Sequence, residues 1–470
     1  MKKNKTRELL LLSLASSVVI VQGCACFARA VPFADNGTLK MLYDNRMHPQ
    51  ALEHDGSVYI VWRGEKGFPY IISYDLESRG FSRPSMLLAG MEEKVDARKY
   101  KKDHHFSPVI WIDSEGYFHV LSGCHGNTPE KYTSGNHVIS TRPGDITKWK
   151  MVTTPINVSV NYPKAYTIFG NKTLIYFRDG GHLGSWTYRI SSDGGRTWVG
   201  PENPPVDLDA APQDGRIADH AGSYHTARLS NDGRMLHVAF VFSRTGYSKD
   251  EPLPVNSRYN VKLDRDSRYN LYYVKVDLAS GKVFNYDGKE LATPVRKMIA
   301  DRDCLLWDTQ ERVVAIGASI YLDENEQPYF LLPVSDETPY KCRFYFLRRQ
   351  NEQWKKTAIT RTSHPFNACH LDRSDDGLFK AYLVTGEGQN ISEEEMDRYG
   401  WGDRVELWIS DRKGESWKLS KDLTPVEGYK YQNIKFVSRE GRETAGGLIL
   451  FYGWQDSNGD GTAFLLDDRE

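Results

Sequence analysis

A hairpin pattern recurs along the whole of this chain, and a repeat constrains the fold more strongly than any single motif does. Each copy has a β-rich run, a turn of Gly, Asp or Asn, and a second run that ends in aromatic or β-branched residues. The seven copies are His48–Trp62, Phe106–Leu121, Tyr162–Phe177, Tyr224–Phe242, Val314–Leu332, Phe366–Val384 and Ile434–Tyr452. The last three are weaker than the first four. No long amphipathic helical segment competes with them.

Further strand-like runs lie between the copies, for example Trp186–Ile190, Tyr269–Val276 and Arg343–Leu347. Each unit therefore has room for four strands. Four-stranded units of roughly 45–60 residues match propeller blades better than solenoid turns. We predict an all-β protein, a seven-bladed β-propeller of four-stranded blades.

One turn motif supports this prediction. Ser191–Trp198 fits the pattern S-x-D-x-G-x-T-W, the "Asp box" hairpin turn seen in sialidase-like propellers. Ser410–Trp417 resembles a decayed copy, with Arg412 where the Asp belongs. We interpret these residues as staples of turns and as markers of the fold rather than as catalytic groups.

The first 30 residues have the organisation of a secretory signal peptide. A basic start precedes an apolar run from Leu9 to Val21, and Ala28-Arg29-Ala30 matches an A-x-A cleavage site. We expect residues 31–470 to form a single catalytic propeller that is secreted or periplasmic. An alternative is a surface lipoprotein anchored through Cys24, because residues 21–24 loosely resemble a lipoprotein cleavage box. No later segment is apolar enough for a membrane span.

The charge balance limits the partners that the chain can attract. Its 61 Lys and Arg residues against 62 Asp and Glu give a formal net charge of -1. Such a chain has no general affinity for nucleic acid, so an anionic ligand must meet locally placed cations. After export, the cysteines that remain are too widely spaced for a disulfide scaffold: Cys124, Cys304, Cys342 and Cys369. We expect a monomer.

Hairpin geometry converts sequence positions into neighbours, because residues equidistant from a turn lie side by side at the open end. In the second copy these residues are His105 and His125. In the third they are Tyr162 and Arg178. Adjacent blades of a propeller point the same way, so we expect these four side chains to converge at one mouth of the central channel.

Other imidazoles and cations fall at matching positions. The first copy adds His48 and Arg63, and the fourth adds His225 and Arg244. The mouth is therefore predicted to be cationic although the chain is nearly neutral. A single His in a strand is usually structural, and we interpret His104 in that way because it points to the opposite strand face from its neighbour.

This set of groups suits β-elimination from a uronic acid. The C5 proton of a uronate is weakly acidic, so the adjacent carboxylate must be neutralised, for which Arg178 and His125 are suitable. A histidine near neutral pKa is a natural base. A tyrosine whose pKa is lowered by neighbouring cations would protonate the leaving oxygen. Catalysis needs no metal or cofactor.

Several motifs together carry a resemblance to a known family. They are Asp103–Pro108, Asp113–Val120, Cys124–Gly126, Tyr162–Lys164, Tyr176–Arg178 and Ser191–Trp198. The chain resembles the seven-bladed propeller ulvan lyases of polysaccharide lyase family 25 and, more broadly, the BNR-repeat proteins. Beyond Trp198 the resemblance is one of blade pattern only.

The resemblance implies roles for the predicted cluster. His105 and Tyr162 would transfer the protons, in either order, and His125 and Arg178 would hold the uronate carboxylate. The implied partner is an anionic, sulfated algal polysaccharide of rhamnose 3-sulfate and uronic acid. By position alone, the further substrate-binding candidates for its sulfate groups are Arg63, His182 and Arg244.

The resemblance also implies a structural zinc. Cys304 together with His225, or with His220 or His237, would supply thiolate and imidazole ligands, although no close ligand spacing supports this and a buried free cysteine is the alternative. A calcium site is less favoured. Asp456–Gly461, with Asp467 at the twelfth position, resembles the start of a calcium loop, but ordinary turn chemistry accounts for it.

Two other functions stay open at this point. A sialidase-like glycoside hydrolase would use arginines with a Tyr–Glu pair or paired carboxylates, whereas the strand ends here offer His and Tyr. A non-catalytic carbohydrate-binding propeller would tolerate the loss of His105 or Tyr162.

Overall fold

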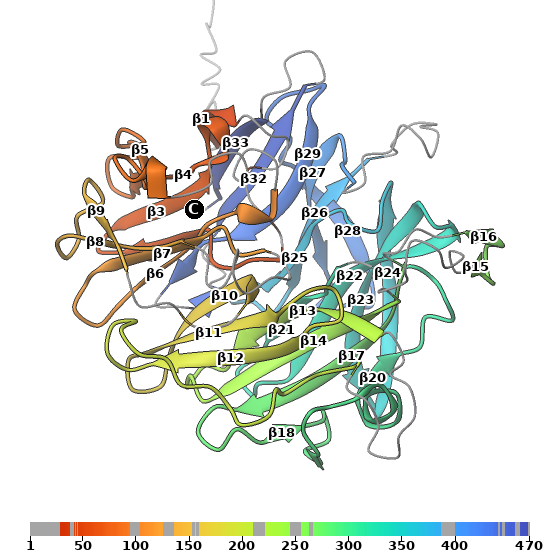
Figure 1. Ribbon diagram of the computed structural model, residues 1–470. Coiled ribbons are helices and arrows are strands. Elements are labelled where there is room, and N and C mark those ends of the chain that lie inside the picture. Colours follow the sequence, from red (N-terminus) through yellow and green to blue (C-terminus); the bar gives the residue numbers. More distant parts are fainter. Residues whose placement is uncertain are drawn as a thin grey trace, which may run out of the picture.

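The computed structural model places consecutive small β-sheets around a central axis, which confirms the predicted seven-bladed propeller (Figure 1). The structure describes residues 29–37, 42, 44, 46–94, 104–125, 136–152, 156, 159–209, 221–244, 255–262, 267–314, 316–386, 400–439, 442–443, 447–455 and 461–468. Each of the seven predicted hairpins forms the first two strands of a blade.

The strands of a blade pair antiparallel and follow one another outward from the channel. Blade one has β2 (Ala51–His54), β3 (Ser57–Arg63), β4 (Pro69–Asp75) and β5 (Ser85–Met86), and blade two has β6 (Val109–Ile112), β7 (Phe118–Ser122), β8 (Asn136–Ser140) and β9 (Trp149–Met151). Blade three has β10 (Val160–Ile168), β11 (Lys172–Asp179) and β12 (Ser185–Ser191), and blade four has β13 (Ala221–Leu229), β14 (Met235–Arg244), β17 (Ser267–Asp277) and β18 (Val283–Phe284). Blade five has β21 (Ser319–Leu322), β22 (Pro328–Thr338), β23 (Lys341–Gln350) and β24 (Gln353–Thr362). Blade six has β25 (Cys369–Arg373), β26 (Phe379–Thr385), β27 (Arg404–Ser410) and β28 (Trp417–Asp422), and blade seven has β29 (Lys430–Phe436), β32 (Leu448–Trp454), β33 (Gly461–Asp467) and β1 (Arg29–Gly37).

Several short strands and helical turns lie outside these main blade strands. In blade three, isolated bridges from β12 to Val199 and Val206 take the place of an outer strand. The remaining strands are β15 (Val255–Asn256), β16 (Val261–Lys262), β19 (Glu290–Leu291), β20 (Leu305–Trp307), β30 (Ser438–Arg439) and β31 (Arg442–Glu443). The helical turns are η1 (Glu65–Gly67), η2 (Glu92–Lys94), η3 (His104–Phe106), α3 (Lys297–Ile299) and η4 (Ala300–Cys304).

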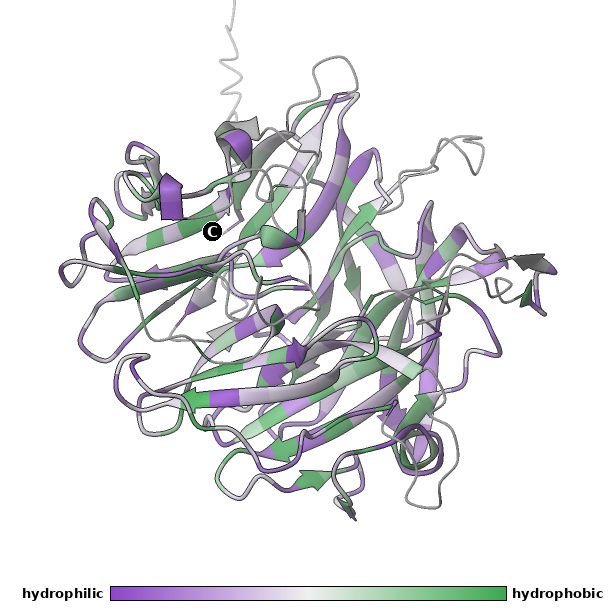
Figure 2. Cartoon of the chain, viewed as in Figure 1, coloured by the Kyte–Doolittle hydropathy of each residue, from purple (hydrophilic) through white to green (hydrophobic). Residues whose placement is uncertain are grey.

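The core lies between neighbouring blades rather than within one sheet. Both faces of a blade are covered, so its second strand reads as a nearly continuous apolar run, as in β14 and β32. Figure 2 shows these hydrophobic residues along the strands of the blades. The first strands of adjacent blades contact one another around the axis, which brings their ends close together.

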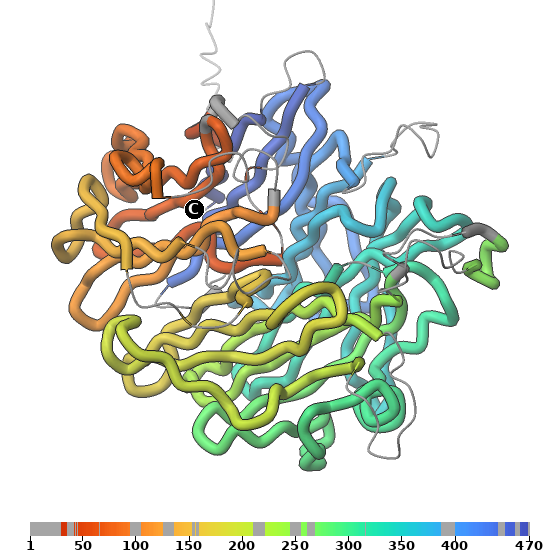
Figure 3. Tube along the Cα trace, viewed as in Figure 1, coloured from red at the N-terminus to blue at the C-terminus, as the bar shows by residue number. Residues whose placement is uncertain are grey.

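The first strand of the chain closes the ring. β1 pairs antiparallel with β33, so that Ala30 lies opposite Leu466 and Val31 opposite Leu465. The N-terminal and C-terminal ends of the described chain are therefore side by side in blade seven (Figure 3). Cleavage after Ala30 would leave Val31–Gly37 to make this closure.

The predicted Asp box staples its turn as expected. The Asp193 carboxylate accepts hydrogen bonds from the amides of Arg196 and Thr197 and from the Thr197 hydroxyl. Trp198 closes the turn by donating its indole N–H to the carbonyl of Gly195. The turn is thus held by one carboxylate and one indole, without a catalytic arrangement.

The second box is intact rather than decayed. Asp411, one residue before the position that Arg412 occupies, accepts hydrogen bonds from the amides of Lys413, Glu415 and Ser416. The Trp417 indole donates to the Gly414 carbonyl, as in the first box. The Asp411 carboxylate, one position earlier, reaches the amides that correspond to those bound in the first box. The turn therefore forms although the sequence does not match the Asp-box pattern.

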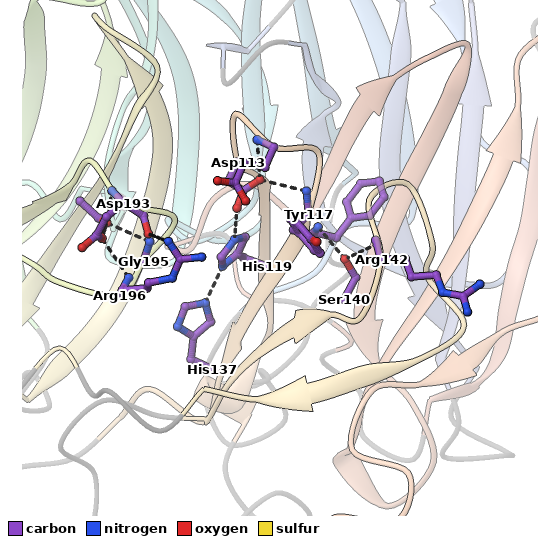
Figure 4. A network of polar contacts seen from close by, with 12 residues as sticks. Asp113, Tyr117, His119, His137, Ser140, Arg142, Asp193, Gly195 and Arg196 are labelled. Atoms are coloured by element: carbon purple, nitrogen blue, oxygen red, sulfur yellow. Dashed lines mark hydrogen bonds and ion pairs between the residues drawn. The ribbon is translucent and has the colours of Figure 1, made fainter.

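The first Asp box also joins two blades. Figure 4 shows its turn beside a chain of polar groups in blade two, in which His119 bridges Asp113 and His137. Gly195 has φ +80°, and a Cβ there would lie 3.2 Å from Cε1 of His137. The glycine is needed both for the backbone conformation and for the close approach of the blades.

Replacing Asp193 with Ala should destabilise the fold without affecting the channel. The turn would lose the acceptor for two amides and two hydroxyls, a loss comparable to that of a helix cap, about 1–2 kcal/mol of the free energy of unfolding. Urea unfolding checks this, with the exposed Ser192→Ala in the same turn as the control. Equal stability of the two variants would contradict the assigned role.

The cysteines are free and no membrane helix is present in the described residues. Cys124, Cys304, Cys342 and Cys369 form no disulfide, as predicted. Within the described ranges, no helix has the length and apolarity needed to cross a bilayer.

Candidate functional site

Two histidines of blade two stack against each other at the open end of their hairpin. His105 lies in η3, just before β6, and His125 follows β7. Their ring centroids are 3.9 Å apart and the rings are inclined by 16°. His105 and its neighbour His104 are in a 3₁₀ turn rather than in a strand, so the strand-face argument for His104 was wrong. The predicted pairing of His105 with His125 is nevertheless observed.

Tyr162 and Arg178 meet at the open end of the blade-three hairpin. Arg178 on β11 pairs with Asn161 on β10, and the register shifts between Asn161 and Lys164, so Tyr162 lies in a bulge. The bulge gives Tyr162 a φ of +56°, which is uncommon for a bulky residue. The Arg178 guanidinium carbon lies 4.7 Å from the centroid of the Tyr162 ring.

The Tyr162 ring connects the two pairs. Its centroid is 5.6 Å from that of His105 and 5.9 Å from that of His125. Residues far apart in sequence on two blades thus surround one phenol ring, as the hairpin geometry predicts. Tyr162 and Arg178 are each about 1% exposed, whereas both histidines are partly exposed.

Arg178 is a buried cation with unused hydrogen-bond donors. Its guanidinium lies against the faces of Tyr162 and Tyr224, and its Nε and Nη1 atoms make no hydrogen bond to any described residue. Buried charges are normally paired, because desolvation is costly. An arginine with free donors beside two imidazoles is suited to bind an anionic group bidentately.

The electrostatics of Tyr162 differ from the prediction. Burial raises the pKa of the Tyr162 phenol above its ordinary value, and the nearby Arg46 and Arg178 only partly oppose this effect. The expected lowering by cations was wrong, because removal of water from the phenol outweighs their charge. Tyr162 is therefore protonated at neutral pH.

Several residues around the phenol were missed in the sequence. Arg46 donates to the Tyr162 hydroxyl and is paired with Asp44, and Tyr224 lies between Arg178 and Arg268. Arg46 and Asp44 precede the first hairpin copy, and Arg268 lies on a third strand. None of the three lies at the end of a predicted hairpin. No signal in the hairpin pattern points to these residues.

Of the additional substrate-binding candidates, His182 contacts Tyr224, which lies beside Tyr162 and Arg178. Its Nδ1 is 3.3 Å from the hydroxyl of Tyr224, and its side chain is exposed. Arg244 ends β14, and the pKa of Glu311 is lowered mainly by a hydrogen bond from Ser257, with a smaller contribution from the charge of Arg244. Arg63 ends β3, where it is buried. Substrate contact by these three residues stays a prediction.

Two histidines expected at the mouth have their side chains buried within the protein. His48 is buried 5.4 Å from the Tyr166 ring, and burial together with nearby cations such as Lys435 lowers its pKa. His225 is buried between blades, stacked on Trp186 at 4.2 Å. Both are positioned by packing within the protein, in keeping with the usual structural role of a strand histidine.

The described residues do not fit the implied zinc. Both ring nitrogens of His225 are hydrogen-bonded, to the hydroxyls of Tyr176 and Ser223 at 2.6 and 2.8 Å. Burial raises the pKa of the Cys304 thiol to about 12, which disfavours a thiolate. Within the described ranges, no three His, Cys, Asp or Glu side chains are grouped to hold a metal. His220 and Asp456–Asp460 lie outside the described residues, so the calcium-loop prediction is not examined by the structure.

Comparison with known proteins gives a family match. Residues 57–362 match the model of the family described as "BNR repeat-containing family member". A Pseudoalteromonas sp. (strain PLSV) protein named "Ulvan Lyase-PL25" is 28% identical over 318 residues, which cover 64% of this chain and 60% of that protein. The "Ulvan lyase" of Nonlabens ulvanivorans is 26% identical over 417 residues, 83% of this chain and 79% of that protein. The chain thus spans about three fifths of the length of the first relative.

Solved structures share the fold. One described as "Structure of a new family of Polysaccharide lyase PL25-Ulvanlyase" superposes with a TM-score of 0.74 at 21% identity, covering 94% of this chain and 96% of that chain. A second structure of the same description, bound to -[GlcA(1-4)Rha3S]-, gives the same values. The propeller architecture is therefore shared over nearly the whole chain.

Proposed function

Because the chain belongs to the BNR repeat-containing family and surrounds a buried phenol with two imidazoles and an arginine, we propose that it is a polysaccharide lyase. It cleaves a uronic-acid-containing polysaccharide by β-elimination and leaves an unsaturated uronate end. The observation that carries this proposal is Arg178, a buried guanidinium with free donors next to proton-transfer groups.

Each group in the cluster has a part in the elimination. Arg178 and His125 bind the uronate carboxylate, which stabilises the negative charge that develops when the C5 proton leaves. The electron pair of the C5–H bond forms the C4–C5 double bond, and the C4–O bond breaks with its electron pair on oxygen. A second proton then neutralises the leaving oxygen.

The burial of Tyr162 supports one assignment of the proton-transfer roles. Because burial holds the phenol protonated, Tyr162 donates the proton to the leaving oxygen. His105, partly exposed and 5.6 Å away between ring centroids, is left as the base that removes the C5 proton.

Ulvan is the polysaccharide that we propose as substrate. Three relatives bear the name ulvan lyase, and a protein of the same fold has been solved with a disaccharide repeat of glucuronic acid and sulfated rhamnose. His182, Arg63 and Arg244 are the candidate contacts for sulfate. Since the cations would bind sulfate by charge, we expect desulfated ulvan to be cleaved more slowly.

Hydrolysis has less support from the site. Glycoside hydrolases generally use two carboxyl groups beside the bond that is cleaved. The Asp44 carboxylate lies behind Arg46, which contacts the Tyr162 hydroxyl, and both of its oxygens accept hydrogen bonds from Arg46. Asp44 is therefore unavailable as a nucleophile or base.

We also propose that residues 31–470 act outside the cytoplasm as one catalytic propeller without a cofactor. The support is the signal-peptide pattern of the first 30 residues and the nature of the substrate, a polymer too large to enter a cell intact. Anchoring through Cys24 is the alternative to release. Mass spectrometry of the mature N-terminus distinguishes a free Val31 from a lipid-modified Cys24.

A panel of polysaccharides tests the substrate class. With the mature chain, ulvan should give the strongest rise in the ultraviolet absorbance of unsaturated uronate, and desulfated ulvan a weaker one. Uronate polymers without rhamnose should give little. Equal rates on all of them would contradict the proposed selectivity, and no rise on any of them would contradict the lyase assignment.

A further inference from the structure

A second arginine approaches Tyr162 from the side of blade one, and it is bound differently from Arg178. The Arg46 guanidinium forms a two-point ion pair with Asp44, from Nε to Oδ1 at 2.8 Å and from Nη2 to Oδ2 at 2.6 Å. Both side chains are buried, at 6% and 2% exposure. The amide of Arg46 donates to Asp44 Oδ1 as well, so the pair is fixed at both its backbone and its head groups.

The remaining part of the guanidinium faces the phenol. Nη1 of Arg46 donates to the Tyr162 hydroxyl oxygen at 3.3 Å, and the guanidinium carbon lies 4.6 Å from the ring centroid. Arg178 lies at nearly the same distance, 4.7 Å. One phenol is thus in contact with two arginines, of which one is paired with a carboxylate and the other has free donors.

A buried lysine ties the two segments together. Nζ of Lys164 donates to the backbone carbonyl of Arg46 at 2.7 Å and approaches that of Tyr162 at 3.4 Å. Tyr162 itself has the unusual φ of +56° in its bulge. Such a conformation persists only when its surroundings hold it. The fold therefore fixes the position of Arg46 relative to the phenol.

The direction of the hydrogen bond decides where the tyrosine proton points. A guanidinium has only donors, whereas a phenol has one O–H donor and an acceptor oxygen. Because Arg46 occupies the oxygen as a donor, the O–H of Tyr162 must point to a different acceptor. The same guanidinium remains next to the oxygen when the proton leaves, and it stabilises the phenolate.

We propose that Arg46, held by Asp44, is a positioning residue that directs the Tyr162 proton toward the leaving oxygen and stabilises the phenolate that forms. This inference rests on the proposed lyase function. Arg178, with its free donors, binds the substrate carboxylate, and the Asp44–Arg46 pair, neutral as a whole, acts on the tyrosine. Arg178 thus serves substrate binding, and Arg46 serves proton transfer.

Steady-state kinetics on ulvan with Arg46→Ala tests the proposal. The kcat should fall about 100-fold, as for loss of one donor to a developing charge, and KM should stay within about twofold because substrate binding is left to Arg178. Added guanidinium ion should restore part of kcat by occupying the vacated site. Arg46→Lys, which keeps a charge but cannot bridge Asp44 and the phenol together, should be intermediate.

Arg312→Ala provides a matched control. Arg312 also donates to a tyrosine hydroxyl, that of Tyr345 at 3.0 Å, but it lies between β20 and β21 and contacts blade five. Its removal should leave kcat unchanged, with no response to guanidinium.

The outcomes separate this inference from the proposed function. An inactive wild-type chain contradicts the lyase assignment itself. An active wild type with normal kcat in Arg46→Ala overturns only the role of Arg46. A rise in KM at normal kcat would make Arg46 a binding residue. A loss of activity that guanidinium does not reverse, in both Arg46→Ala and Arg46→Lys and with a lowered melting temperature, would make it merely structural.

Discussion

Replacing Arg178 with Met should abolish nearly all activity and leave the fold as stable as before, or more stable. The side chain of Met fills a similar volume against Tyr162 and Tyr224 but cannot neutralise a carboxylate. Loss of such charge stabilisation costs about 100- to 1,000-fold in kcat. Arg178→Lys should recover only part of this rate, because an ammonium lacks the two-point geometry of the guanidinium.

The stability measurement makes this prediction specific. A buried charge with unused donors is destabilising in the absence of a ligand, so its removal should not lower the free energy of unfolding. Arg189 is a suitable control, since it lies on the neighbouring strand β12, donates to the Tyr188 carbonyl, and is not part of the cluster. Arg189→Met should keep its activity. A large loss of stability in Arg178→Met would instead assign Arg178 a structural role.

The second large effect that we expect is acid lability. Burial is the main cause that lowers the pKa of six described histidines: His48, His137, His225, His237, His364 and His370. For His237 and His364 the folded-state pKa falls to about 3. The unfolded chain takes up protons on these groups below a pH of about 6.5, whereas the folded chain does not.

The sign and window of the effect follow from these shifts. Above a pH of about 6.5 both states are neutral at these histidines and stability is complete. As the pH falls below that value, each histidine lowers the free energy of unfolding by up to about 1.4 kcal/mol per pH unit until its folded-state pKa is reached. Three carboxyl groups act in the opposite direction, because burial raises the pKa of Asp179, Glu326 and Asp372, that of Asp372 to about 6, but they are fewer than the six histidines.

Urea unfolding at pH values of about 7.5 and 5.5 measures this effect. The free energy of unfolding should be several kcal/mol lower at the acidic pH. Replacing the buried His237 with Phe should weaken the pH dependence, whereas replacing the more exposed His54 with Gln should not. A stability that is flat between the two pH values would show that the histidines remain solvated or carry partners that accept the charge.

The sequence predicted the fold well because the repeat is local. Each hairpin turn is encoded by adjacent Gly, Asp and Asn residues, and seven such hairpins in succession are typical of a closed propeller. The closure by β1 was not predicted, since Arg29–Gly37 lacks a hairpin partner nearby and pairs with β33 at the other end of the chain. The second Asp box was likewise not recognised as intact, because the sequence pattern requires the Asp at position 412 whereas the carboxylate is that of Asp411.

The site was predictable to the extent that symmetry about a turn places its residues. His105, His125, Tyr162 and Arg178 are equidistant from turns, and their ring contacts are those expected of hairpin ends. The Tyr162 pKa was mispredicted because charges are visible in a sequence but burial is not. Asp44 and Arg46 were missed for a different reason, because only the bridge between His48, which precedes β2, and Lys164 on β10 brings their segment to the phenol.

The central claim is that the cluster around Tyr162 performs an elimination, and the products of ulvan cleavage test it most directly. The absorbance of unsaturated uronate and the release of reducing ends should be measured together on one digest. We predict that the two rise in equal molar amounts, because each cleavage creates one double bond and one reducing end. Reducing ends without the absorbance would identify hydrolysis and contradict the account.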